Sequence, residues 1–311
     1  MSDIACKEAI AEVLSELVEK DPRIMVLCSD SRGSSGFTAF AEEHPENFVE
    51  CGIAEQDEVG IAAGLAAVGL HPYVAAPACF LSARSLEQVK VDVAYSHMNV
   101  KIFGVSGGIS YGALGASHHS THDIAVMRCF PDLEVYLPSD ANQMKAIVRA
   151  VEKTEKPCYI RSGRGKVPQV YQSEEGAFTY GRMNTLAEGS DITVISCGEL
   201  TIQALRASRA LKEEGISCRV LDSPSLKPFD SEAVVKAARE TGLILTVEEH
   251  VVLGGLGAAV SQTVTEKCPV RVCSLGLPDE YLPGGTSAEL FALYGLSAAG
   301  ITRKVKELLG K

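Results

Sequence analysis

Short apolar runs alternate with stretches of helical period along the whole chain. Residues 4–18 repeat apolar side chains at helical spacing, and the run 24–28 is apolar throughout, which predicts a helix followed by a buried strand. Similar runs predict strands at 48–51, 73–76, 100–105, 133–137, 158–160, 192–196, 218–221, 243–247 and 270–274. Because strands that alternate with helices usually form parallel sheets covered on both faces, the pattern predicts the α/β class.

The chain is long enough for two domains. It has 311 residues, 46% of them hydrophobic, whereas a domain commonly has about 100–200 residues. Between residues 164 and 190 the sequence becomes polar and rich in Gly, Gln and Glu, which is typical of a linker. We therefore predict two consecutive three-layer α/β/α domains with mostly parallel sheets, over residues 1–167 and 188–311, joined by a linker at 168–187.

Composition argues against several classes of function. The formal net charge of −11 disfavours a surface that binds nucleic acid or an anionic membrane. No apolar run reaches the ~18–20 residues of a membrane span, and residues 1–20 lack the apolar segment of a signal peptide. The ten cysteines are scattered, without a Cys-x-x-Cys pair and mostly in apolar runs, so we expect buried, reduced thiols and a cytoplasmic location.

One carboxylate is placed where a predicted strand turns into a helix. Glu55 follows the run 48–51 and precedes a helix composed almost wholly of small apolar residues. A carboxyl group desolvated in this way can hold a proton and donate a short hydrogen bond to a ring nitrogen of a ligand. Alternatively, Glu55 and Asp57 only stabilise the amino end of the helix through its dipole, by about 0.3–1 kcal/mol.

Two loops that follow predicted strands contain further candidate residues, because parallel sheets bind ligands at the carboxyl ends of their strands. Residues 29–36, Ser-Asp-Ser-Arg-Gly-Ser-Ser-Gly, form the first loop. The second, 104–123, is rich in glycine, which permits close approach of the backbone to a ligand, and contains His118, His119 and His122. A metal site is a weaker alternative, because no cysteine accompanies these histidines at a familiar zinc spacing. Ordinary surface histidines are another.

The sequence around Glu55 resembles a known family. Gly-Ile-Ala-Glu-Gln at 52–56, followed by Gly-x3-Gly-Leu-Ala at 60–66, resembles the pyrimidine-binding domain of the thiamine diphosphate-dependent transketolases. Residues 225–230 and 247–257 resemble the third domain of the same enzymes, so the resemblance covers essentially the whole chain. It implies that Glu55 bonds N1′ of the cofactor's aminopyrimidine, which then removes the proton from C2 of the thiazolium.

The resemblance also implies roles for other side chains. Phe80 matches an aromatic residue that packs on the pyrimidine, and His118 matches a histidine that binds the donor sugar and assists proton transfer. Arg164 matches an arginine that binds the sugar phosphate, a role that guanidinium suits through bidentate pairing, although Arg161 is an alternative. The full predicted site comprises Glu55, Ile53, Gln56 and Phe80 for the cofactor, and His118, Arg164, Ser34, Ser35 and Ser106 for the substrate.

Three positions depart from the family pattern. Leu114 replaces an aspartate that contacts a sugar hydroxyl, Ser106 replaces a histidine, and Lys7 replaces an arginine. Loss of a group that hydrogen-bonds a hydroxyl changes substrate choice strongly. We therefore expect a different or modified donor sugar in place of the usual ketose phosphate, such as xylulose 5-phosphate.

Part of the family's cofactor site is absent from this sequence. The chain contains no Gly-Asp-Gly with a downstream Asn, the residues that hold the diphosphate and Mg²⁺ in transketolases. We therefore predict no metal ligands on this chain and a partner, the N-terminal transketolase subunit, that binds the diphosphate and Mg²⁺. The resemblance implies two copies of each chain.

Together these observations predict the C-terminal subunit of a split transketolase, which transfers a two-carbon ketol unit from a ketose to an aldose. The main alternative is the beta subunit of the decarboxylating component of a 2-oxoacid dehydrogenase, which often has a His-His-Ser phrase like that at 118–120. Half of a deoxyxylulose phosphate synthase and a non-catalytic interaction subunit are further alternatives. We expect Glu248, Glu249 and His250 to be structural or interfacial, because they end a buried strand before a glycine-rich turn.

Overall fold

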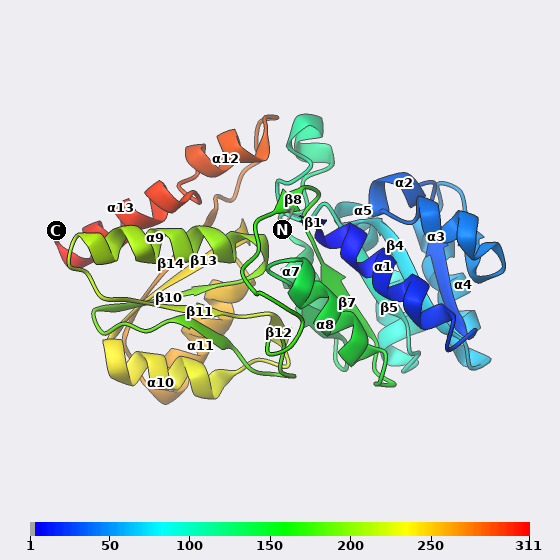
Figure 1. The fold of residues 1–311 in the computed structure, drawn as a ribbon, viewed down its shortest axis with the longest axis horizontal. Helices are drawn as coiled ribbons and strands as arrows, with labels where there is room; N and C mark the ends of the chain where they lie inside the picture. The colour runs from blue at the N-terminus through cyan, green and yellow to red at the C-terminus, as the bar shows by residue number, and fades with distance from the viewer. Residues whose placement is uncertain (1–3) are drawn as a thin grey trace.

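The computed structural model describes residues 4–311, within which the strands form two main sheets that lie side by side (Figure 1). The strands of the first sheet are β2 (Ile24–Cys28), β3 (Phe48–Glu50), β4 (His71–Pro77), β5 (Lys101–Val105), β6 (Glu134–Tyr136), β7 (Cys158–Arg161) and β12 (Ser225–Lys227). Their order is β12-β6-β7-β5-β4-β2-β3, and all neighbours are parallel except β12 and β6. The predicted α/β class is confirmed.

The second sheet is also mostly parallel. Its strands are β9 (Asn184–Ala187), β10 (Ile192–Ser196), β11 (Cys218–Asp222), β13 (Leu243–Val251) and β14 (Arg271–Leu277). Their order is β14-β13-β10-β11-β9, with only the β11–β9 pair antiparallel. Every strand predicted from an apolar run has a counterpart in one of the two sheets, whereas β9 lies inside the predicted linker, 168–187.

Helices cover both faces of the first sheet. They are α1 (Cys6–Val18), α2 (Arg32–Ser35), α3 (Thr38–Glu43), η1 (Pro45–Asn47), α4 (Glu55–Ala67), α5 (Ala78–Ala83), α6 (Leu86–Gln88), η2 (Val89–Tyr95), η3 (Gly112–Ser117), α7 (Asp123–Arg128) and α8 (Ala141–Val151). On one face, Ile10 of α1 and Ile147 of α8 share a core cluster with Phe103 of β5. On the other face, Val59 of α4 and Leu81 of α5 belong to a second cluster. The sheet is therefore buried on both sides, as expected for parallel strands.

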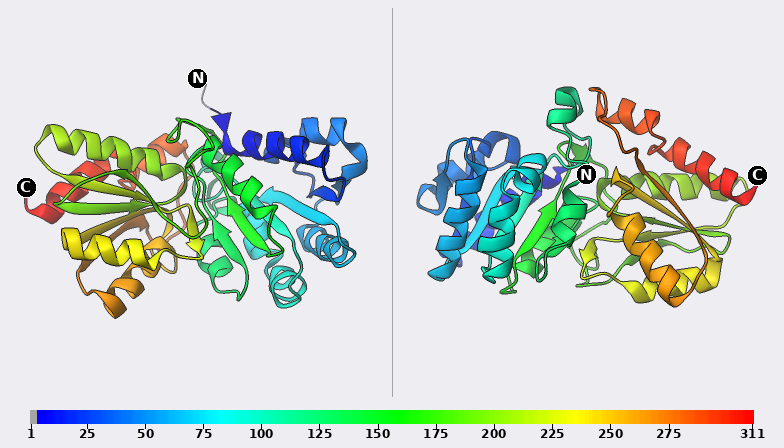
Figure 2. Two further views of the ribbon diagram at one scale, coloured as in Figure 1. Left: turned by 60° about the horizontal axis from the view of Figure 1, so that its bottom comes forward. Right: turned by 180° about the vertical axis from the view of Figure 1, so that it is seen from behind.

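The second sheet is covered in the same way (Figure 2). Its helices are η4 (Gly198–Leu200), α9 (Thr201–Glu213), α10 (Ser231–Thr241), α11 (Leu256–Lys267), α12 (Ser287–Leu293) and α13 (Ala298–Leu309). Leu211 of α9 and Val305 of α13 pack on one face. On the other face, Val234 of α10 and Val260 of α11 join the cluster that contains Val59 of the first domain. One apolar core therefore runs continuously between the two domains.

Two strand pairings link distant parts of the chain. β1 (Ile4–Ala5) pairs with β8 (Lys166–Val167), so the first helix begins at Cys6 and not at residue 4. β12 leaves the second half of the chain and pairs antiparallel with β6, at the edge of the first sheet. The edge of the first sheet is thus completed by residues from beyond the predicted domain boundary.

All ten cysteines lie within the described residues and are free. Six are buried, but Cys129 is exposed and Cys51, Cys268 and Cys273 are partly exposed. The expectation of buried thiols is therefore wrong for these four, because they lie at element ends or on a strand near the sheet edge. Among residues 4–311, no helix is long and apolar enough to cross a membrane.

Candidate active site

A cavity of about 260 Å³ lies at the carboxyl ends of β2 and β4. Its lining comes from the loop after β2, the start of α4, helix α5 and the histidine-containing loop 104–123, and comprises Ser29, Asp30, Ser31, Ser34, Ile53, Glu55, Pro77, Phe80, Arg84, Tyr111 and His118. Carboxyl ends of parallel strands are the usual ligand-binding edge of such sheets. The structure thus brings five of the predicted site residues to one cavity: Ser34, Ile53, Glu55, Phe80 and His118.

Glu55 is the first residue of α4 and is only 2% exposed. Its Oε2 lies 2.5 Å from Nη1 of Arg84, and the Arg84 guanidinium also lies over the Phe80 ring, 4.5 Å from its centroid. Burial of a carboxylate without a partner costs roughly several kcal/mol, and an ion pair with additional bonds offsets that cost. Arg84 therefore stabilises the charged form of Glu55 within the cavity.

His118 lies against two aromatic rings in the same cavity. Its ring centroid is 5.2 Å from that of Phe80 and 5.3 Å from that of Tyr111, both in edge-to-face arrangements. A hydrogen bond of 3.0 Å joins Ser117 Oγ and His118 Nδ1. Such packing fixes the orientation of the imidazole, so the wall of the cavity presents an ordered histidine beside the aromatic face of Phe80.

Cationic side chains lie at the rim of the cavity. The Arg164 guanidinium is 4.0 Å from the centroid of Tyr111, and Lys7 Nζ donates a 3.0 Å hydrogen bond to the carbonyl of Ser34. Burial lowers the pKa of Lys7, and the positive charge of Arg164 lowers it further. An anion bound between these two groups would relieve their repulsion, so the rim suits a negatively charged part of a ligand.

Arg161, the alternative to Arg164, has a structural position. Its guanidinium is buried, lies 3.0 Å from Asp123 Oδ2, and donates a 2.7 Å hydrogen bond to the carbonyl of Glu249. Asp123 also accepts a 2.7 Å hydrogen bond from the Tyr159 hydroxyl. Because these partners occupy Arg161 in the interior, Arg164 is the arginine placed at the rim of the cavity.

Three predicted site residues do not line the cavity. Ser35 is fully buried and its hydroxyl donates to the carbonyl of Ala75 over 3.4 Å, so the prediction that Ser35 binds substrate is wrong. Ser106 is 1% exposed in a left-handed backbone conformation (φ +62°). Gln56 is exposed and points away from the cavity, because successive residues of a helix face different directions. Neither residue contacts the cavity that contains Glu55.

Sequence reasoning missed Arg84 and Tyr111. Arg84 follows Phe80 by four residues, a spacing that places two helical side chains on one face, and this was the available signal. Tyr111 is in the glycine-rich loop, where no periodicity predicts which side chain faces a ligand. Both residues contact a predicted one: Arg84 pairs with Glu55, and Tyr111 packs on His118.

The cavity fits the aminopyrimidine of thiamine diphosphate. It combines a buried carboxylate, Glu55, with the aromatic face of Phe80 and the apolar side chain of Ile53. Glu55 would hold a ring nitrogen and Phe80 would pack on the ring. When bound, this cofactor supplies the electron sink with which a carbon–carbon bond next to a carbonyl can be broken.

A metal-competent group of side chains within residues 4–311 lies elsewhere. Asp21, His71 and Glu152 have ligand atoms within 4.8 Å of one another, at the amino end of β4, whereas the cavity is at its carboxyl end. Arg23 makes two hydrogen bonds to the Asp21 carboxylate, at 2.9 and 2.6 Å. This group is therefore neutralised by protein contacts and is remote from Glu55.

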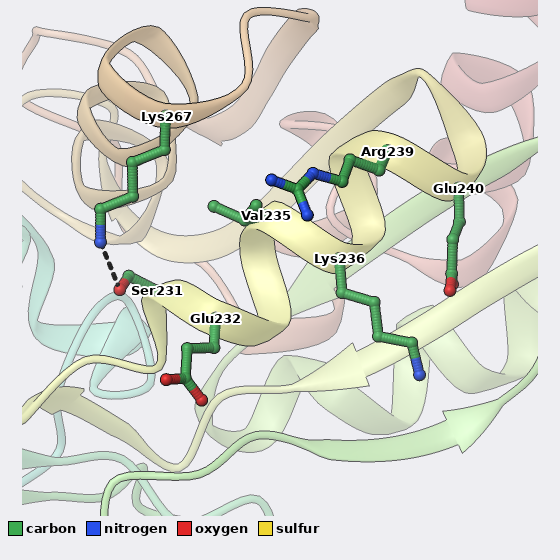
Figure 3. A pocket seen from close by; sticks show the side chains of 7 residues that line it. All are labelled: Ser231, Glu232, Val235, Lys236, Arg239, Glu240 and Lys267. Atoms are coloured by element: carbon green, nitrogen blue, oxygen red, sulfur yellow. Dashed lines mark hydrogen bonds between the residues drawn. The ribbon is translucent and has the colours of Figure 1, made fainter.

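A second hollow, of about 440 Å³, lies on the surface of the second domain against α10 (Figure 3). All of its lining side chains are partly or fully exposed, and most are charged: Ser231, Glu232, Val235, Lys236, Arg239, Glu240 and Lys267. Lys267 Nζ donates a 2.9 Å hydrogen bond to Ser231 Oγ across the hollow. With mixed charges and no buried polar group, this surface lacks the features of a ligand site.

Two domain families match the chain: the pyrimidine-binding domain of transketolase over residues 2–169, and the transketolase C-terminal domain over residues 181–301. This chain belongs to the transketolase family. A solved structure described as a split gene transketolase, inactive beta4 tetramer, is 40% identical, covers 98% of each chain and superposes with a TM-score of 0.90. The protein is thus the C-terminal subunit of a split, thiamine diphosphate-dependent transketolase.

Curated relatives extend over the full length of this transketolase subunit. One of the subunits of apulose-4-phosphate transketolase from Phocaeicola vulgatus is 52% identical over 308 residues, 99% of this chain and 98% of that protein. The 6-deoxy-6-sulfo-D-fructose transketolase subunit SqwH of a Clostridium species is 35% identical over 302 residues, 97% and 94% of the two chains. Leishmania mexicana transketolase, 22% identical with a TM-score of 0.84 over 46% of its length, shares the fold.

The second domain of the transketolase subunit supports the site without lining it. Glu248 accepts hydrogen bonds from the backbone N–H groups of Leu256 (2.7 Å) and Gly257 (2.8 Å), and so fixes the start of α11. His250 is buried, and its Nδ1 lies 2.6 Å from the carbonyl of Val251. None of these side chains lines the cavity, which agrees with the expectation that they are structural.

Proposed function

We propose that Glu55 activates thiamine diphosphate while Phe80 packs on its pyrimidine, and that His118 binds the donor ketose and moves a proton at its oxygen functions. The observation that supports these roles is the convergence of the three side chains on one cavity at the ligand-binding edge of the first sheet. His118 is held by Phe80, Tyr111 and Ser117. An ordered imidazole is suited to proton transfer near neutral pH.

We propose that the donor is a ketose with an anionic group at the end remote from the carbonyl. Arg164 and Lys7 at the rim supply positive charge for that group, and the Ser34 hydroxyl, in the same loop, lines the cavity. Leu114 is 47% exposed and offers no hydrogen bond where the family pattern has an aspartate. The relatives named for apulose 4-phosphate and 6-deoxy-6-sulfofructose act on unusual anionic sugars. A branched or modified sugar of this class fits the altered site.

We propose a partner subunit that holds the diphosphate and Mg²⁺, with two copies of each chain in the assembly. The outer face of α4 is suited to this contact. A methyl group added at Gly60 or Gly64 would meet nothing within 4 Å, so these glycines do not serve packing inside the chain. Val68, at the end of the same helix, is 76% exposed. Small residues allow a helix of another subunit to approach closely. The free cysteines favour a reducing compartment, and we propose the cytoplasm.

Reconstitution tests this function. The chain is combined with the N-terminal subunit, thiamine diphosphate and Mg²⁺, and assayed with anionic ketoses as donors and an aldose phosphate as acceptor. Ketol transfer by the pair, and none by either chain alone, is the expected result. Decarboxylation of pyruvate or a branched 2-oxoacid without ketol transfer would instead identify a 2-oxoacid dehydrogenase component. Failure of the folded pair to bind the cofactor in a calorimetric titration would identify a non-catalytic subunit.

A further inference from the structure

A second glutamate lies one turn along α4 from Glu55. Glu58 is fully buried, with no exposed surface. Its two hydrogen-bond partners are uncharged: the Ser29 hydroxyl bonds Oε2, and the backbone N–H of Ala75 donates to Oε1 over 3.2 Å. In the described part of the chain, no cation lies within ion-pair distance of Glu58. A buried carboxyl without a cation is costly and needs a reason.

The two hydrogen bonds of Glu58 join three elements beneath the cavity. Ser29 directly follows β2 and lines the cavity. Ala75 belongs to β4, and its carbonyl accepts a 2.8 Å hydrogen bond from the hydroxyl of Ser31, which also lines the cavity. The first turn of α4, which contains Glu55, is thereby tied to the ends of both strands. Glu58 touches the residues that form the wall and does not itself line the cavity.

The surroundings of Glu58 disfavour its ionised form. Four titratable groups face it: Glu55 on α4, Glu50 on β3, Cys28 at the end of β2 and Cys51 after β3. Burial raises the pKa of Glu58 to about 8, and the charges of Glu55 and Glu50 add to the rise, while the two hydrogen bonds oppose it. At neutral pH the group therefore holds its proton.

We propose that Glu58 is a positioning residue for the transketolase site: its buried carboxyl fixes Ser29 and the first turn of α4, and so holds Glu55 in place. This inference rests on the function proposed for Glu55. Ionisation of Glu58 puts a second buried negative charge one turn from Glu55 and weakens the arrangement. Activity should therefore fall above about pH 8, because the proton on Glu58 is lost there.

Two variants separate the roles of the hydrogen bonds and of the proton. In Glu58→Gln, the amide oxygen can accept from Ala75 and the amide nitrogen can donate to Ser29, but the side chain never ionises. Glu58→Met keeps the length of the side chain and removes both hydrogen bonds. Glu19→Gln, at an exposed position after α1, is the matched control for loss of a carboxylate.

The pH dependence of kcat/KM is measured for the reconstituted complex, together with the ¹³C titration of the Glu58 carboxyl in the full chain alone. We expect wild type and Glu19→Gln to lose more than fivefold between pH 7.5 and 9.5, and Glu58→Gln less than twofold, with equal activities at pH 7. Glu58→Met should bind thiamine diphosphate at least tenfold more weakly at pH 7. The carboxyl should titrate near pH 8.

Superimposable pH profiles for wild type and Glu58→Gln, or a carboxyl that titrates near pH 4.5, would overturn the inference. So would full cofactor affinity in Glu58→Met. These failures differ from failure of the proposed function: that function fails if Glu55→Ala retains activity, whatever Glu58 does. Circular dichroism of each variant establishes that the chain is folded before the comparison.

Discussion

The carboxylate of Glu249 accepts a 2.7 Å hydrogen bond from the backbone N–H of Ile109, 140 residues earlier in the chain. Glu249 belongs to β13 of the second domain, and Ile109 begins the loop that leads to His118. A methyl group added at Gly108 would lie only 2.4 Å from Cδ of Glu249, so the loop passes directly against this side chain. The second domain thus orders the histidine-containing loop, although it does not line the cavity.

Removing the Glu249 carboxyl should loosen this loop. We expect Glu249→Ala to lower the free energy of unfolding by about 1–3 kcal/mol, because the buried N–H of Ile109 loses its acceptor. It should also lower kcat, because His118 is less well placed. Glu249→Gln retains an acceptor and should keep most of both. Urea unfolding and steady-state assays measure the two effects, and identical losses in both variants would contradict the assigned contact.

Glu55 should be essential for turnover but not for folding. We expect Glu55→Gln and Glu55→Ala to reduce kcat by roughly 10²-fold or more, the range lost when a group acting in the transition state is removed. Size-exclusion chromatography should show normal association with the partner subunit. Near-wild-type activity in Glu55→Ala would show that another group activates the cofactor.

The ion pair between Glu55 and Arg84 should contribute more to stability than a surface pair. Glu55 is almost fully buried, whereas exposed pairs contribute only about 0.2–1 kcal/mol. A double-mutant cycle with Glu55→Gln and Arg84→Gln, measured by urea unfolding of the chain, should give a coupling free energy of about 1–2 kcal/mol. A coupling near zero would mean that solvent screens the pair.

Arg164 should determine affinity for the charged end of the donor. We expect Arg164→Gln to raise KM for an anionic ketose by about 10- to 100-fold, the equivalent of one charge-assisted hydrogen bond of roughly 1.5–3 kcal/mol. The KM for an uncharged ketose should change little. Arg182→Gln is a matched control, since Arg182 pairs with Glu232 on the surface of the second domain. An equal rise in KM for both donors would place the charged group elsewhere.

Glu199 should make folding stability depend on pH. Burial raises its pKa to about 8, and the charge of Glu249 adds to the rise. An unfolded chain loses this proton near pH 4.5, so the group contributes stability that is lost as pH rises between about 4.5 and 8, by at most about 1.4 kcal/mol per pH unit. Glu199→Gln should show a smaller decline in unfolding free energy between pH 5 and 8 than wild type, and an unchanged slope would show that Glu199 ionises normally.

The sequence predicted the strands and the position of Glu55 because both depend on local pattern. Apolar runs identify buried strands, and the position of a residue at a strand–helix junction follows from the order of elements. The Glu55–Arg84 pair could not be predicted in this way, because it depends on how α4 and α5 pack. Ser35 was misassigned for a related reason: adjacent residues of the short helix α2 point in different directions, so Ser34 lines the cavity and Ser35 does not.

The crossing of β12 into the first sheet has a consequence for how the subunit can be dissected. A fragment that ends in the segment 168–187 would lack β12, and the backbone of β6 would be left open to solvent along that edge. Unpaired strand edges recruit other chains, so such a fragment should aggregate when expressed by itself. Expressing the two domains separately would therefore sever a structure whose halves mature together.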